Sequence, residues 1–168
     1  MKKMIDLYKT EASAAFNSID SGDIGKFVEL IIDAYKGEKT VFACGNGGNV
    51  ASVQNLVLDL NMHPFVSEDK SKRSGERNKF KSVSLCDSGA TITGLTNDLG
   101  FENIFVEQLK YQCNPGDILF AMSGSGNSKN IVEALTYAKD HGMICVVMTR
   151  NRDTKADEYA DLVLRIDS

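Results

Sequence analysis

The sequence predicts an α/β fold: a three-layer α-β-α sandwich with a five-stranded parallel sheet, preceded by an N-terminal helical hairpin. Five short runs are apolar along their whole length, which is typical of strands that are covered on both faces. Helical segments alternate with these runs through short connections, which indicates a parallel sheet between helices. A chain of 168 residues, 42% of them hydrophobic, is long enough to bury such a core in one domain.

The first 36 residues are predicted to form the helical hairpin. Apolar side chains recur at helical spacing in residues 3–19, and a second stripe runs from Ile24 to Tyr35. The sequence DSGD separates the two stripes, with Asp23 as the expected N-cap of the second helix and Gly37 as the residue that ends it. The apolar stripe of this hairpin needs a partner surface.

Residues 37–168 are predicted to form the parallel α/β core, so that residues 1–168 make a single domain. The strands are expected at 40–44, 81–86, 118–122, 144–149 and 162–166. Helices are expected at 50–60, 101–112 and 129–140, with one helical turn at 156–160. The connection 61–80 is long and irregular, and such loops are usually functional or disordered. A further helix would be expected to cover the last strand, supplied by a partner chain or by a segment outside these residues.

Composition argues against several classes of partner. The net charge of −4 provides no basic field for nucleic acid, and acidic residues interrupt the one basic stretch, 68–81, so a solvated loop is favoured over a polyanion site. No apolar run approaches the length of about 20 residues that a membrane span needs, and the N-terminus lacks the apolar core of a signal peptide. Four cysteines without a CxxC pair indicate free thiols in a reducing cytoplasm.

Two turns of small residues stand at the expected carboxyl ends of strands, each before a helix. One is CGNGGN at 44–49, the glycine turn, and the other is SGSGNS at 123–128, the serine loop. Ligands of parallel sheets bind at such ends, and a helix N-terminus suits an anion. Ser123, Ser125 and Ser128 would add hydroxyl donors around one phosphate without a basic side chain.

Two other interpretations of these turns remain. Ser128 or Asn127 would only cap the helix while the glycines make the turn. A nucleotide site is less well supported, because CGNGGN lacks the GxGxxG spacing and no GxxxxGK[ST] motif is present. Two such turns in one sheet favour a phosphorylated small molecule that lies between them.

Three motifs resemble the sugar isomerase (SIS) domain: CGNGGN, TNDLGFENIF at 96–105 and GDILFAMSGSGNSKNIVEAL at 116–135. More narrowly, they are similar to the phosphoheptose isomerases, which interconvert sedoheptulose 7-phosphate and a heptose 7-phosphate. The resemblance covers residues 20–166 approximately and in order. It implies a five-stranded parallel sheet, a homotetramer with sites between subunits, and a cytoplasmic enzyme of surface-polysaccharide (lipopolysaccharide or capsule) precursor synthesis.

The resemblance also implies substrate-binding roles at ten positions. They are Asn46, Gly47, Gly48 and Asn49 in the first substrate loop, Asn97 and Asp98 in a pair that contacts the sugar, and Ser123, Gly124, Ser125 and Ser128 in the phosphate loop. Asn49 stands where the family has a serine, and it still offers a donor. Asn97 and Asp98 would otherwise be a turn at the edge of a helix.

The match departs from the family at the catalytic positions. There the family carries a His and, four residues later, a Glu, which can bind zinc together with a Gln and a His from a C-terminal helix. This chain has Asn55 and Asp59 instead, so Asp59 is the candidate base. Asn is a poor zinc ligand, and zinc is expected only if a C-terminal segment or a neighbouring chain supplies ligands. The apolar residues around Asp59 predict a mostly buried helix, in which an unpaired carboxylate is costly; the alternative is a solvent-facing carboxylate.

Three functions are compatible with this pattern. The first is a phosphoheptose isomerase that works as a homo-oligomer on a phosphorylated sugar. The second is a non-catalytic sugar-phosphate-binding SIS module that acts as a sensor or protein-interaction regulator. The third is an isomerase of another phosphosugar, such as a hexose.

Overall fold

The computed structural model describes residues 1–62 and 80–167. Most of the expected connection at 61–80 and of the basic stretch at 68–81 lies outside these described residues.

The sheet has five parallel strands in the order β2-β1-β3-β4-β5. The strands are β1 (Thr40–Gly45), β2 (Lys81–Ser84), β3 (Ile118–Met122), β4 (Ile144–Arg150) and β5 (Leu162–Ile166). The chain first adds β2 on one side of β1 and then adds β3 on the other side. The order of the strands therefore reverses between β1 and β3, which is where an open parallel sheet forms a ligand crevice.

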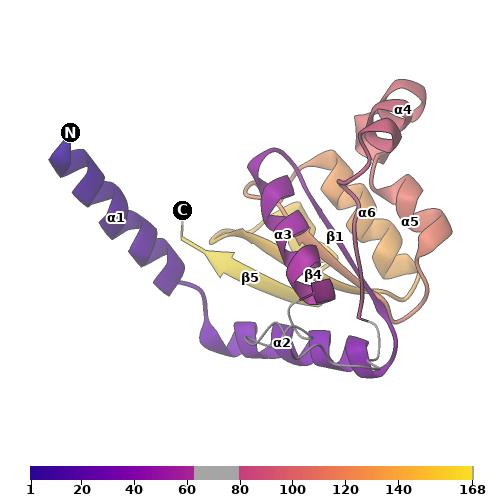
Figure 1. Ribbon diagram of the computed structural model, residues 1–168, viewed down its shortest axis with the longest axis horizontal. Helices are drawn as coiled ribbons and strands as arrows, with labels where there is room; N and C mark the ends of the chain where they lie inside the picture. The colour runs from indigo at the N-terminus through magenta and orange to yellow at the C-terminus, as the bar shows by residue number, and fades with distance from the viewer. Residues whose placement is uncertain (63–79, 168) are drawn as a thin grey trace, which may run out of the picture.

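Helices cover both faces of the sheet, and the predicted three layers are confirmed (Figure 1). One face packs against α2 (Ser21–Lys36) and α3 (Gly48–Met62), and the other against α5 (Val106–Gln112) and α6 (Lys129–Asp140). The remaining helical segments are α1 (Lys2–Asn17), α4 (Gly89–Leu99) and the short 3-10 helices η2 (Phe101–Asn103) and η3 (Lys155–Glu158).

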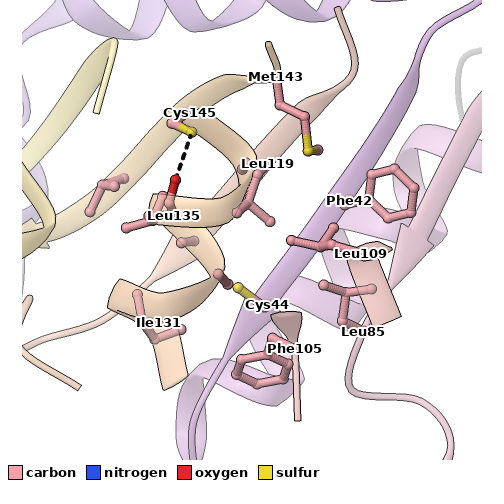
Figure 2. Close-up of a cluster of buried hydrophobic side chains, with 14 of the residues drawn as sticks. Phe42, Cys44, Leu85, Phe105, Leu109, Leu119, Ile131, Leu135, Met143 and Cys145 are labelled. Carbon is pink, nitrogen blue, oxygen red and sulfur yellow. Dashed lines mark hydrogen bonds between the residues drawn. The ribbon is translucent and has the colours of Figure 1, made fainter. Parts of the chain in front are cut away.

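The core is divided in two by the sheet, because successive strand residues point to opposite faces. Figure 2 shows the half under α5 and α6, in which Phe42 and Leu119 from the strands meet Leu109 and Leu135 from the helices. These four side chains are at most 1% exposed. Full burial of one such side chain stabilises the fold by about 1.5–3 kcal/mol.

The N-terminal region contains the two predicted helices, but α1 extends away from the body instead of lying back along α2 (Figure 1). Tyr8 and Phe16 on α1 are 72% and 73% exposed. The N-cap of α2 is Asp20, whose carboxylate accepts from the backbone N–H of Asp23 at 3.0 Å. The expectation that Asp23 is the N-cap was therefore wrong by three residues, since Asp23 lies inside the first turn of the helix.

Helix α4 was not predicted. Its sequence, GATITGLTNDL, contains two glycines and three threonines, which are weak helix formers, but Ser88 caps it by accepting from the N–H of Thr91. The predicted helix at 101–112 is split into η2 and α5. None of the helices in residues 1–62 and 80–167 has the length and apolarity that crossing a membrane requires.

Candidate functional site

The glycine turn joins β1 to α3. The N–H of Asn49 donates to the carbonyl of Asn46 at 3.1 Å and closes the turn. Gly47 has a φ of +56°, in the left-handed region that favours glycine. The side chains of Asn46 and Asn49 are partly buried and are both used inside the protein.

Two asparagines tie the glycine turn to the far side of the strand-order reversal. The amides of Asn46 and Asn130 donate to each other, at 2.9 Å from Asn46 and 2.8 Å from Asn130. Asn130, in the first turn of α6, is only 2% exposed. Asn49 Nδ2 also donates to the carbonyl of Met122 at the end of β3, at 3.3 Å. The structure thus brings the glycine turn and the serine loop together, as a ligand lying between them requires.

The serine loop is folded around Ser123 and Gly126. Ser123 is 4% exposed, and its Oγ accepts from the N–H of Gly126 at 3.1 Å. The same hydroxyl lies 3.5 Å from the hydroxyl of Ser128. Gly126 has a φ of +62°, and a Cβ built on it would lie 2.3 Å from atoms of the Thr154 side chain. Only glycine fits at this position.

Helix η3 supports the serine loop from outside. The N–H of Ala156 donates to the carbonyl of Gly126 at 3.0 Å, and the N–H of Lys155 donates to Asn127 Oδ1 at 3.0 Å. A reciprocal capping box joins Thr154 and Asp157 at the start of η3. The loop is therefore fixed before any ligand arrives.

Asp157 holds this support in place through its carboxylate. It accepts from Arg165 Nη2 at 2.7 Å and from the N–H of Thr154 at 2.7 Å. Burial alone would raise the pKa of Asp157, but the hydrogen bonds from Arg165 and Thr154 outweigh it and hold the pKa below its usual value.

Several donors of the serine loop are not used by the protein. Ser128 is the N-cap residue of α6, yet its side chain makes no capping hydrogen bond. In the part of the chain that the structure describes, the backbone N–H groups of Ser125, Ser128 and Lys129 have no acceptor. The interpretation in which Ser128 serves only as a cap is thus not supported, although Asn127 does shape the turn by donating to the carbonyl of Ser125 at 2.9 Å.

A cleft of about 180 Å³ opens on the other side of the glycine turn, toward β2. The turn contributes Gly45, Asn46 and Gly47. The rest of the lining is mostly apolar and comes from Val50, Cys86, Ile92, Phe101, Ile104 and Phe105. The serine loop does not line this cleft. The glycine turn lines the cleft and is also hydrogen-bonded, through Asn46, to Asn130 in the helix that follows the serine loop.

The cysteines are not suited to nucleophilic chemistry. All four are free thiols, and burial raises the pKa of each, to about 12 for Cys145. Cys86 lines the cleft, and its thiol donates to the carbonyl of Gly45 at 3.5 Å. It remains protonated at neutral pH and contributes as a small apolar side chain.

Asn97 and Asp98 are not brought to the two turns within one chain. Both are exposed in the last part of α4, where Asn97 Nδ2 donates to Asp98 Oδ1 at 2.8 Å. Neither lines the cleft. Their contact with a sugar stays a prediction, and it would need a site that another chain completes.

The surroundings of Asp59 differ from the expectation. Helix α3 buries only Val53 and Val57, while Leu58 is 55% exposed and Asn55 is exposed, so the predicted mostly buried helix was wrong. Asp59 is half-buried. It follows the buried residue Val57 by two positions, so its side chain is turned about 200° around the helix axis from that of Val57, away from the sheet. It lies 11 residues beyond Gly48, which corresponds to about 16 Å along the helix axis.

Asn55 and Asp59 do not fit a zinc site. They share one side of α3, but an amide and a single carboxylate make a poor ligand set for this metal. Among residues 1–62 and 80–167, no group of three or more His, Cys, Asp or Glu side chains is arranged to hold a metal ion. We therefore derive no catalytic step through zinc.

A family model described as "SIS domain" matches residues 8–150. The chain belongs to the SIS domain family. It is 34% identical to the phosphoheptose isomerase of Rhodospirillum rubrum over 132 residues, which cover 79% of this chain and 65% of that relative. It is 29% identical to the phosphoheptose isomerase of Campylobacter concisus over 168 residues, covering 100% of this chain and 83% of that relative. The resemblance to SIS domains and to phosphoheptose isomerases is confirmed.

The fold is also that of solved relatives. A phosphoheptose isomerase structure from Francisella tularensis superposes with a TM-score of 0.83 at 24% identity, and the match covers 99% of this chain and 85% of that one. This likeness confirms the predicted five-stranded α/β fold with N-terminal helices.

Proposed function

We propose that this SIS protein is a phosphosugar isomerase that binds a phosphorylated sugar between the serine loop and the glycine turn. The observation that supports this most is the state of the serine loop. Hydroxyls of Ser123 and Ser128 lie 3.5 Å apart at the N-terminus of α6, and contacts with η3 hold the loop around them. Among the described residues, the backbone N–H groups of Ser125, Ser128 and Lys129 have no acceptor. The phosphoheptose isomerase relatives support the assignment of the reaction class.

The serine loop would hold the phosphate group. Hydroxyl donors from Ser123, Ser125 and Ser128 and free N–H groups at the start of α6 can surround its oxygens, and the helix dipole favours its negative charge. Hydrogen bonds to a charged acceptor of this kind are stronger than neutral ones. Gly124 leaves the backbone open to a close approach.

The glycine turn would position the sugar. The Asn46 amide is paired with the Asn130 amide, which fixes its orientation in advance of substrate binding. The backbone N–H groups around Gly47 and Gly48 and the amide of Asn49 lie on the same turn. In an isomerisation, groups of this kind hold the carbonyl and hydroxyls while a base acts on the neighbouring carbon.

The reaction requires a base that removes a proton from one carbon and returns it to the adjacent carbon through an enediol, with a donor that polarises the carbonyl. In a ketose or aldose phosphate, these carbons lie at the end of the chain opposite the phosphate. The base must therefore lie well away from the serine loop. Asp59 is the proposed base.

We further propose a homo-oligomer, a tetramer by the family resemblance, in which neighbouring chains complete each site. Large apolar side chains are left exposed on three helices: Leu7, Tyr8 and Phe16 on α1, Val28 and Ile32 on α2, and Leu58 and Met62 on α3. Such a surface is typical of an interface. An assembly would also allow Asp59, Asn97 and Asp98 of one chain to reach a site on another. Sedimentation equilibrium would test it, and a monomer at micromolar concentration would contradict it.

For the substrate, we propose sedoheptulose 7-phosphate, converted to a heptose 7-phosphate in the cytoplasm for surface-polysaccharide precursors. The support is the name that the relatives share. The test is a coupled isomerase assay with this substrate, using the chain, Asp59→Asn and the control Asp140→Asn, an exposed carboxylate at the far end of α6. We expect turnover by the chain and the control, and a loss of at least a hundredfold in kcat for Asp59→Asn.

Each other outcome has a distinct meaning. If Asp59→Asn keeps its activity, the base is another residue. If the chain binds the phosphosugar without converting it, the protein is a non-catalytic sugar-phosphate-binding module. If it converts a hexose phosphate instead, the reaction class holds and the substrate assignment is wrong.

A further inference from the structure

Arg150, the last residue of β4, lies beside the serine loop. Strands β3 and β4 pair in register as far as Met122 and Met148, two residues before Gly124 and Arg150. The nearest atom to a Cβ built on Gly124 is Arg150 Nε, at 3.8 Å. The side chain of Arg150 therefore passes next to the exposed backbone of Gly124, in the space that the absent side chain leaves open.

The backbone of Arg150 is fixed, whereas its guanidinium group is not held by a carboxylate. The carbonyl of Arg150 accepts from Arg165 Nη1 at 3.2 Å and from the N–H of Arg152 at 2.8 Å. Within the described ranges, no carboxylate forms an ion pair with Arg150, while the neighbouring Arg165 is paired with Asp157 at 2.7 Å. The guanidinium group of the exposed residue Arg150 thus has no carboxylate partner among the described residues, and it lies next to a loop with unused backbone donors.

We infer that Arg150 is a phosphate-binding residue of this site, and that its guanidinium group donates to the phosphate oxygens of the substrate held by the serine loop. This inference rests on the proposed function. The other donors, the serine hydroxyls and backbone N–H groups, are neutral. A guanidinium group supplies the missing charge, and its planar N–H groups match two phosphate oxygens at once.

The position of Arg150 decides which kinetic parameter it affects. It contacts the end of the substrate that does not react, so its interaction is equally strong in the ground state and the transition state. Interactions of this type lower KM and leave kcat unchanged. Arg150 is therefore a specificity-determining residue that selects phosphorylated sugars over neutral ones.

The test compares Arg150→Gln and Arg150→Lys with the control Arg152→Gln in the whole chain. Arg152 is exposed, lies two residues away and loses the same charge, and within residues 1–62 and 80–167 only its backbone takes part in hydrogen bonds. Binding of inorganic phosphate and of sedoheptulose 7-phosphate is measured by isothermal titration calorimetry at one fixed ionic strength. We expect Arg150→Gln to weaken both at least tenfold, Arg150→Lys to weaken them less, and Arg152→Gln to stay within twofold of the unsubstituted chain.

The outcomes separate this inference from the function on which it rests. If Arg150→Gln loses no more affinity than Arg152→Gln, the effect is one of general charge and the assignment of Arg150 is wrong, while the site itself stands. If the unsubstituted chain binds neither phosphate nor phosphosugar, both the proposed function and the inference fail. In an active protein, a fall in kcat with unchanged KM for Arg150→Gln would also overturn the assignment.

Discussion

The glycine turn and the serine loop occupy equivalent places in the fold, but they differ in which of their polar groups the protein itself uses. Each follows a buried parallel strand and precedes a helix. In the glycine turn, the side chains of Asn46 and Asn49 bond to other parts of the protein. In the serine loop, η3 donates to the carbonyl of Gly126 and to the side chain of Asn127, whereas the hydroxyl of Ser128 makes no capping bond. This difference agrees with the proposal that the glycine turn positions the substrate and the serine loop binds its phosphate, although the two sequences are equally rich in small residues.

Each of the two turns contains one glycine in the left-handed region, and substitution of these glycines tests the difference between the turns most directly. Gly47 and Gly126 have φ values of +56° and +62°, but a Cβ at 47 would meet nothing within 4 Å, whereas one at 126 would overlap Thr154 at 2.3 Å. Gly47→Ala should cost only the left-handed penalty of about 1–2 kcal/mol. Gly126→Ala should cost about 2–5 kcal/mol, because overpacking adds about 1–3 kcal/mol. Urea denaturation of both variants measures the difference, and equal losses would show that Thr154 moves aside freely.

The Asn46–Asn130 pair tests whether the glycine turn depends on the serine-loop side of the sheet. Truncating either residue to Ala leaves the other amide unpaired, which should lower the free energy of unfolding by about 1–3 kcal/mol. Once one partner is gone, removing the second should cost much less, so the double variant should fall short of the sum by at least about 1 kcal/mol. A double-mutant cycle in urea gives this coupling energy. Losses that add within about 0.5 kcal/mol would mean that the two turns are independent.

Much of the fold was predictable from local signals in the sequence. The bounds of β3 and α6 agree with the prediction, because an apolar run is followed by a turn and then by an amphipathic helix that ends before Gly142. Helix α4 was missed because Gly94 and its threonines have low helix propensity, and the cap at Ser88 was not recognised. The direction of α1 could not be predicted, since it depends on surfaces that lie outside the segment itself.

The site was predictable only where a motif carries it. The motif residues Asn46 and Ser123 lie on turns that the structure brings together. Asn130, Thr154 and Arg150 were not predicted, because their contacts depend on the packing of α6 and η3 and on the register of β3 with β4. Sequence spacing identifies residues on one turn, whereas the partners that fix the turn come from distant segments.

Substitution of two N-cap serines, Ser88 and Ser128, tests whether a serine at this position serves the stability of the helix or the binding of a ligand. Ser88 accepts from the N–H of Thr91 at 3.1 Å, whereas Ser128 makes no capping bond. Ser88→Ala should therefore lower the free energy of unfolding by about 1 kcal/mol and leave phosphate affinity unchanged. Ser128→Ala should change stability by less than about 0.5 kcal/mol while weakening phosphate binding roughly tenfold, the effect of losing one hydrogen bond to a charged group. Thermal unfolding and calorimetric titration of both variants measure this, and a stability loss confined to Ser128→Ala would reverse the roles.

The support of the serine loop by Asp157 is expected to depend on pH. Hydrogen bonds from Arg165 and Thr154 outweigh the opposing effect of burial and hold the pKa of this carboxyl below its usual value. A group with a lowered folded-state pKa contributes stability above its unfolded pKa, about 3.9, and loses it as the pH falls through the folded value. At pH 7, Asp157→Asn should be less stable than the unsubstituted chain by about 1 kcal/mol, near the upper limit for a partly exposed ion pair.

The difference in stability between Asp157→Asn and the unsubstituted chain should shrink below about pH 4, because the carboxylate of the unsubstituted chain is then progressively protonated and loses its charge, so that it resembles the neutral asparagine. Urea midpoints between neutral and acid pH measure it. Asp33→Asn serves as the control, since Asp33 lies 3.9 Å from Lys36 with both side chains at least 70% exposed, and an ion pair this exposed contributes little to stability. A stability loss for Asp157→Asn that stays constant into acid would mean that the shape of the hydrogen-bonded turn at Thr154 matters and the charge does not. In that case the serine loop is held by neutral hydrogen bonds, as the glycine turn is by its paired amides, and the ion pair of Asp157 with Arg165 adds little to the support.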